Sequence, residues 1–124
     1  MPDQALPAEL REFLATHIDS IAELEALLLV RESRETVWDV HSLAKRLYVE
    51  EQQALEVLSH LGAHGFVERD ADRFRYAPIS ADLDRLAGLL AEYYRHHLIP
   101  VTQLVHAKTR RIRQFADAFK LKKD

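Results

Sequence analysis

Apolar residues recur at helical spacing through most of the chain, with polar residues between them, and this pattern predicts a mainly helical protein. The first such stretch covers residues 7–17, where Pro7 suits the start of a helix because its φ angle is already fixed. The second begins near Ile21, after the capping-box pattern formed by Ser20 and Glu23. It is apolar on most sides, so we expect it to be the central, buried helix.

Two shorter helices are predicted between Asp39 and Gly65. Asp39 is a good N-cap for the first, because its carboxylate can accept from an unpaired backbone N–H. The second runs from about Glu50 to His64, and Gly65 then ends it, as expected for a glycine in left-handed geometry. The inward positions of the two helices are Val40, Leu43, Ala44 and Leu47, followed by Ala54, Val57, Leu58 and Leu61.

After these helices the spacing changes to alternation. This predicts a small β-hairpin with strands at 66–69 and 73–76 and a turn at 70–72. Because side chains alternate along a strand, the aromatic residues of the second strand share one face and its arginines the other. These are Phe74 and Tyr76 on one face, and Arg73 and Arg75 on the other.

The last periodic stretch opens at Ser80 or Asp82 and is interrupted by Pro100. Proline removes a helical hydrogen bond, so we expect either one bent helix or two helices that meet near Ile99. The stretch carries a long apolar stripe of Leu83, Leu86, Ala87, Leu90, Tyr94, His97, Val101 and Leu104. The stripe exceeds what so small a body needs, which predicts a homodimer through residues 81–106; alternatively, it packs on the chain's own core.

With 124 residues, the chain has the size of one domain with a modest core. The patterns divide it into an N-terminal helical extension (1–18), a body of helices and hairpin (19–78), a C-terminal dimerisation helix (79–108) and a basic, flexible tail (109–124). In the tail, Phe115, Ala118 and Phe119 predict at most a short amphipathic turn.

The two short helices with their tight connection, the glycine stop and the hairpin resemble the winged helix-turn-helix domain of bacterial transcription regulators. The resemblance covers residues 20–78 and depends on the pattern from Leu43-Ala44 to Gly65-Phe66-Val67. It implies that Thr36-Val37-Trp38 adds a one- or two-residue strand to the hairpin. It also implies a cytoplasmic, homodimeric regulator that binds double-stranded DNA without catalysis.

In the family, the second helix of the pair enters the major groove, and its exposed residues contact base edges. Gln52 and Gln53 match such positions, where each could bind adenine. Basic residues on the preceding helix and on the hairpin would then hold phosphates. The expected nucleic-acid contacts are Lys45, Arg46, Gln52, Gln53, Arg69, Arg73 and Arg75.

The helix that should enter DNA contains no lysine or arginine, and it carries carboxylates at Glu50, Glu51 and Glu56. Such a charge is unfavourable beside phosphates. This favours an alternative, in which the acidic helix docks a partner protein. Glu51, Leu55 and Glu56 would then form the contact, because an outward-facing leucine is common in protein interfaces.

Charge is unevenly distributed along the chain. Residues 108–124 contain seven basic and two acidic side chains, a net charge of +5, which leaves −8 on the remaining 107 residues and −3 in total. A basic end on an acidic body is typical of a nucleic-acid or acidic partner, and also of a solvated terminus. No run of about 18 apolar residues and no secretion-signal pattern occurs, so no membrane partner is expected.

The chain has no cysteine and only three glycines, which excludes thiolate catalysis, cysteine-ligated zinc and a glycine-rich phosphate loop. We therefore expect no enzyme activity and no cofactor. His60 and His64 have a helical spacing that can hold a metal, which makes a metal sensor a third, minor hypothesis, but the sequence shows no third ligand near them, so no metal site is predicted. His97 is expected to be buried and hydrogen-bonded at an interface.

Overall fold

The computed structural model describes residues 6–122, and this part of the chain contains six helices and one two-stranded antiparallel sheet. In chain order the elements are α1 (Ala8–His17), α2 (Ile21–Glu32), α3 (Val40–Leu47), α4 (Glu51–Ala63), β1 (Val67–Asp70), β2 (Arg73–Tyr76), α5 (Ala81–His96) and α6 (Leu98–Lys122). The prediction of a mainly helical protein with a small hairpin is confirmed.

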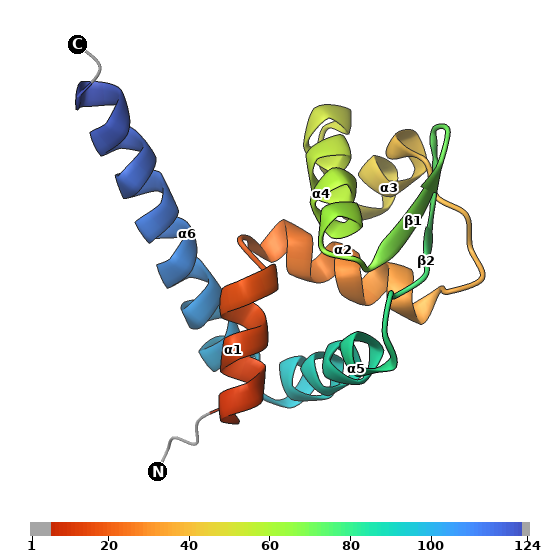
Figure 1. Cartoon of the computed structure of the whole chain (residues 1–124), viewed down its shortest axis with the longest axis horizontal. Coiled ribbons are helices and arrows are strands. Elements are labelled where there is room, and N and C mark those ends of the chain that lie inside the picture. The colour runs from red at the N-terminus through yellow and green to blue at the C-terminus, as the bar shows by residue number, and fades with distance from the viewer. Residues whose placement is uncertain (1–5, 123–124) are drawn as a thin grey trace.

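Helix α2 crosses the middle of the body, with α3 and α4 on one side and α5 on the other (Figure 1). Its N-cap Ser20 accepts a 3.2 Å hydrogen bond from Glu23 N, as the capping pattern predicts. The Glu23 carboxylate reaches one residue further back than predicted and accepts from Asp19 N at 2.6 Å. Leu24 and Leu27 are fully buried, so α2 is the central helix, as expected.

Helices α3 and α4 pack directly against each other and are joined by residues 48–50. Asp39 caps α3: its Oδ1 accepts from Ser42 N at 2.7 Å, and Ser42 Oγ accepts from Asp39 N at 3.0 Å. The chain leaves α3 through Tyr48, which takes the left-handed conformation with a φ of 59°. Gly65 follows α4 with a φ of 83°, so the glycine stop is confirmed.

Strands β1 and β2 form the predicted hairpin. Its turn is one residue shorter than expected, because Asp70 pairs within the ladder and Ala71 adopts a left-handed φ of 59°. Trp38 adds a single bridge to Phe74 through two backbone hydrogen bonds of 2.7 Å, so the expected third segment is present. Phe74 and Tyr76 are buried on one face of β2, as the alternation predicts.

The C-terminal region consists of two helices rather than one bent helix. Ser80 is the N-cap of α5, and its Oγ accepts from Leu83 N at 3.1 Å. Helix α5 ends at His96 and α6 begins at Leu98. Pro100 lies in the first turn of α6, where its missing N–H breaks no helical hydrogen bond, so the chain can restart the helix there.

Most of the apolar stripe on α5 and α6 faces the chain's own core. Ala87, Leu90 and Val101 are fully buried there. This part of the stripe therefore packs on the chain's own core, which was the alternative to dimerisation. His97 is exposed within the chain and stacks on Tyr93 with 5.1 Å between ring centroids. His97 lies between the two helices at the surface of the single chain, so its expected burial at an interface stays a prediction.

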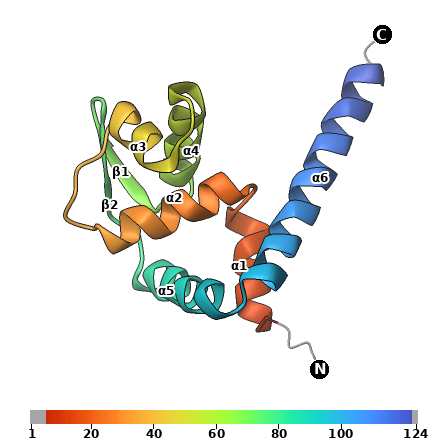
Figure 2. The ribbon, with the colours of Figure 1, turned by 180° about the vertical axis from the view of Figure 1, so that it is seen from behind.

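The second half of α6 projects from the body and carries the C-terminal end away from it (Figures 1 and 2). Residues 109–122 continue the helix, so the prediction that this segment forms at most a short amphipathic turn is wrong. The segment after Pro100 contains no further proline and no glycine, which leaves nothing to end the helix. Ile112, Phe115 and Phe119 are exposed along this projection. None of the described helices is long and apolar enough to cross a membrane.

Candidate functional site

The exposed side of α4 is the first part of the candidate site. Gln52 and Gln53 lie in its first turns and are both exposed. Leu55 is half-buried, so it offers less apolar surface to a partner than the sequence suggested. A surface hollow lies beside the two glutamines and is lined by Tyr48, Val49, Glu50, Gln52, Gln53 and Glu56.

Sequence reasoning missed Tyr48, the aromatic residue at the edge of this hollow. Its side chain is 94% exposed, although its backbone adopts the left-handed conformation that glycine normally occupies. A strained and fully exposed aromatic residue is a common feature of contact sites, because packing gives no reason for it. No glycine lies between the two closely spaced helices, and Tyr48 occupies the position at the end of α3 that takes left-handed geometry.

Three polar side chains of α4, Glu51, Gln52 and Glu56, have partners within the chain. His41 Nδ1 lies 2.8 Å from Glu51 Oε2, which connects α3 to the start of α4. Gln52 Nε2 donates to Glu56 Oε2 at 3.4 Å. A ligand that binds Gln52 must therefore replace a long, weak hydrogen bond, and Glu56 stays beside it as a negative neighbour.

Lys45 and Arg46 form the second part of the candidate site. Both are exposed in the last turn of α3, where positive side chains interact favourably with the carbonyl end of the helix. They line neither of the two hollows near the α3–α4 turn and the hairpin. They therefore add exposed positive charge at the end of α3, outside both hollows.

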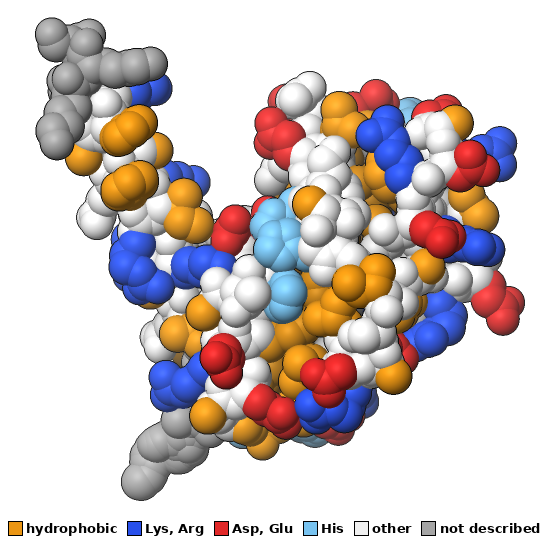
Figure 3. All heavy atoms as spheres, viewed as in Figure 1, with side chains coloured by type: hydrophobic (Ala, Val, Ile, Leu, Met, Phe, Trp, Pro, Cys, Tyr) orange, Lys and Arg blue, Asp and Glu red, His pale blue; other side chains and the backbone are white. Residues whose placement is uncertain are grey.

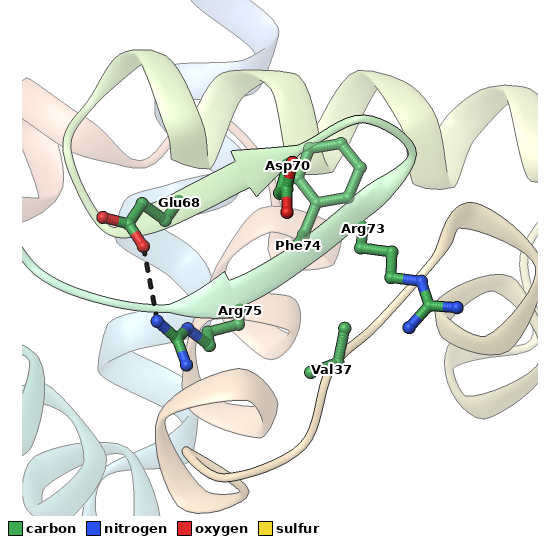
Figure 4. A pocket seen from close by; sticks show the side chains of 6 residues that line it. All are labelled: Val37, Glu68, Asp70, Arg73, Phe74 and Arg75. Carbon is green, nitrogen blue, oxygen red and sulfur yellow. Dashed lines mark ion pairs between the residues drawn. The ribbon is translucent and has the colours of Figure 1, made fainter.

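The hairpin contributes three arginines with different surroundings. Arg75 pairs with Glu68 across the strands at 3.6 Å (Figure 4). Arg69 donates from Nε to Ala71 O at 2.8 Å and lies 5.1 Å from the centre of the Phe74 ring.

Arg73 differs from these two arginines. In Figure 4 it extends away from the Arg75–Glu68 pair, and among residues 6–122 its side chain forms neither an ion pair nor a hydrogen bond. It is therefore the hairpin arginine best able to meet a phosphate. The hollow it borders is lined by Val37, Glu68, Asp70, Arg73, Phe74 and Arg75.

The charge balance over α3, the turn, α4 and the hairpin is slightly acidic. Five exposed basic residues lie there: Lys45, Arg46, Arg69, Arg73 and Arg75. Seven exposed carboxylates accompany them: Asp39, Glu50, Glu51, Glu56, Glu68, Asp70 and Asp72. Hydrogen bonds from Ser42 lower the pKa of Asp39, which keeps that carboxylate charged. The basic residues are thus interspersed with acids and form no continuous positive surface.

The basic residues near the C-terminus separate into two groups. Arg110, Arg111 and Arg113 are exposed on the projecting part of α6. Lys108 belongs instead to the body, because its ammonium pairs with Asp19 at 2.7 Å and donates to the carbonyls at the end of α1. The exposed group, which also includes Lys120, is available to an external partner.

Lys45, Arg46, Gln52, Gln53, Arg69, Arg73 and Arg75 are thus all exposed, and they lie on two adjoining helices and one hairpin. The structure joins the glutamines to Tyr48 in one hollow and Arg73 to Arg75 in another. The alternative residues Glu51 and Glu56 are also exposed on α4, and Glu56 lines the hollow with the glutamines. No known protein family, curated protein or solved structure matches this chain.

Proposed function

We propose that residues 19–78 form a winged helix-turn-helix domain and that the chain is a cytoplasmic, DNA-binding transcription regulator that acts as a homodimer. The observation that carries this proposal is the display of Gln52 and Gln53 at the exposed start of α4, beside a hairpin whose arginines face outward. The three-residue connection between α3 and α4 supports it, because helix-turn-helix pairs use turns of this length.

In this account α4 enters the major groove and Gln53 meets an adenine edge, since its amide can donate and accept at once. Arg73 and the α3 pair Lys45 and Arg46 hold phosphates on either side of the groove. The carboxylates on α4 lower affinity for all sequences. They also accept hydrogen bonds from cytosine, so they add selectivity at the expense of strength.

Dimerisation is assigned to α6. Leu98 and Ile99, within the segment 81–106, are 54% and 65% exposed. The projecting half adds Ile112, Phe115 and Phe119, which recur at helical spacing and leave an apolar face without cover in the single chain. A second copy of the same helix is the simplest cover, since twofold pairs are the commonest oligomers.

A specific observation favours a second candidate, a protein-docking domain. Glu50 and Glu56 line the hollow that Tyr48 borders, Glu51 is exposed next to Glu50 in the chain, and an exposed tyrosine beside acids suits a basic protein partner. In this case the chain binds no DNA. Reversal of charge at Glu51 and Glu56 then abolishes capture of the partner.

The two candidates are separated by an electrophoretic shift assay on fragmented genomic duplex at low salt. The regulator account expects shifted fragments with the wild-type chain and weaker shifts when Lys45, Arg46 and Arg73 are changed to glutamine. Arg95→Gln is the matched control, because Arg95 is exposed on α5, away from the α3–α4 pair. In the same assay Glu51→Lys with Glu56→Lys strengthens DNA binding if α4 meets phosphates. Absence of any shift by the wild-type chain removes the regulator account.

A further inference from the structure

We propose that a divalent transition metal ion binds where α1, α2 and α4 meet, held by Asp19, Glu23 and His60. One ligand atom from each of these side chains lies within 4.8 Å of the other two. His60 Nε2 is 3.3 Å from Glu23 Oε1, and the two side chains are only 17% and 13% exposed. The site thus combines an imidazole and two carboxylates at a partly buried junction.

These distances suit a metal ion of the size of zinc. Ligand atoms at about 2.0–2.2 Å from zinc lie roughly 3–3.7 Å apart, so the His60–Glu23 distance already matches. The three ligand atoms lie within 4.8 Å of one another, a wider limit than this range, so the side chains move closer on binding, and His60 Nε2 exchanges its 2.6 Å contact with His17 O for the metal. Three protein ligands with an open fourth position form a recognised zinc arrangement, and a nitrogen with carboxylate oxygens also suits cobalt.

Two more histidines lie beside this group. His17 Nδ1 is 2.9 Å from His64 Nδ1, and the His64 ring stacks on His60 with 4.2 Å between centroids. Figure 3 shows histidine side chains grouped at the surface, where solvent and ions reach them. Either one can supply a fourth ligand or orient His60, as neighbours of metal-bound histidines commonly do.

Lys108 is the natural competitor for the site. Its Nζ lies 2.7 Å from Asp19 Oδ1, but it also donates to Ala15 O at 2.6 Å and to Ile18 O at 2.8 Å. It can therefore release Asp19 to a metal and keep its bonds to the end of α1. Removal of the Lys108 charge should leave Asp19 available and strengthen metal binding.

This site cannot be recognised from the spacing of its ligands in the sequence. His60 is separated from Glu23 by 37 positions, so the helical spacing of His60 and His64 gives no indication of the carboxylates. The ligands come from the loop before α2, from α2 itself and from the last turn of α4. A bound metal would therefore fix the end of α4 against α2, independently of what α4 contacts.

The test is calorimetric titration of the full chain with zinc, repeated with cobalt to record its absorption spectrum. We expect one zinc per chain, binding at least about tenfold weaker in His60→Gln and in Glu23→Gln, and cobalt absorption typical of four-coordinate geometry. Lys108→Met is expected to bind at least about threefold more tightly. The control is His96→Gln, because exposed His96 lies at the end of α5 and pairs with Glu92 rather than with the proposed ligands, so affinity should not change.

Circular dichroism shows whether each variant is folded. Because His60→Gln and Glu23→Gln are tested separately, the result does not depend on the folding of one variant alone. The proposal is overturned if the wild-type chain takes up no zinc at about 100 µM, the upper end expected for a useful site. It is equally overturned if His60→Gln and Glu23→Gln bind zinc as the wild type does. Unchanged affinity in Lys108→Met excludes Asp19 as a ligand.

Discussion

Tyr76 Oη donates a 2.6 Å hydrogen bond to Asp84 Oδ1, and this contact joins the hairpin to α5. Asp84 Oδ1 also accepts hydrogen bonds from Arg31 Nε at 3.2 Å and from Arg34 Nη2 at 3.3 Å. The Arg34 guanidinium also lies 5.2 Å from the centre of the Tyr76 ring. One carboxylate thus holds α2, β2 and α5 together and sets the position of the hairpin that carries Arg73.

Asp84→Asn should lower the free energy of unfolding by about 1–2 kcal/mol, because three hydrogen bonds lose their charged acceptor. Urea unfolding measures the loss. Asp82→Asn is a matched control, since Asp82 lies in the same first turn of α5 but is more exposed and pairs only with Arg85 among residues 6–122. Its effect should stay within about 0.5 kcal/mol. Equal losses in both variants would contradict the assigned network.

The same carboxylate predicts a pH dependence. The hydrogen bond from Tyr76, followed by the charges of Arg34 and Arg31, lowers the pKa of Asp84 below its ordinary 3.8. A lowered folded-state pKa gives stability that is present above the unfolded value and is lost as the pH falls through the folded one. The difference in unfolding free energy between wild type and Asp84→Asn should therefore shrink below about pH 4. A difference that grows on acidification would refute this assignment.

Tyr48→Gly should stabilise the fold and weaken binding by the α4 surface. Glycine relieves a left-handed strain of about 1–2 kcal/mol but increases the entropy of the unfolded chain, so the expected net gain is about 0.5–1 kcal/mol. Tyr48→Ala separates the effects, because alanine removes the ring and keeps the strain. Thermal unfolding and DNA titration of both variants provide the comparison. A loss of stability in Tyr48→Gly would mean that the tyrosine ring contributes packing.

The exposed face of α6 predicts how the chain assembles. Phe115→Ser with Phe119→Ser should convert a particle of twice 14.3 kDa into one of 14.3 kDa in analytical ultracentrifugation. Gln114→Ser is the control, because this residue is exposed on the same projecting segment and is not part of the apolar face. A wild-type chain that sediments as a monomer at all concentrations would exclude the homodimer.

Local rules predicted the helix ends well. Ser20, Asp39 and Ser80 each accept from a backbone N–H three residues later, and Gly65 adopts the expected φ. Such interactions depend only on neighbours within one turn of helix, so the sequence alone reveals them. Tyr48 escaped prediction, since no rule places an aromatic residue in left-handed geometry.

Contacts between distant residues could not be predicted. Lys108 follows Leu14 by 94 positions and still caps the end of α1, so a residue assigned to a basic terminal segment belongs to the body. The contacts of the hairpin arginines in the candidate site could not be predicted either. Alternation predicted that Arg73 and Arg75 face outward, but only the structure shows that Arg75 pairs with Glu68.

Fluorescence anisotropy with duplex DNA, titrated between about 50 and 200 mM salt, tests the proposed function most directly. At least three phosphate contacts should weaken binding by about thirtyfold or more over this range, because each releases a bound counterion. Arg73→Gln should reduce the slope of log affinity against log salt by about one. No binding at the lowest salt, or an affinity that does not change with salt, would contradict DNA recognition and leave the protein-docking account.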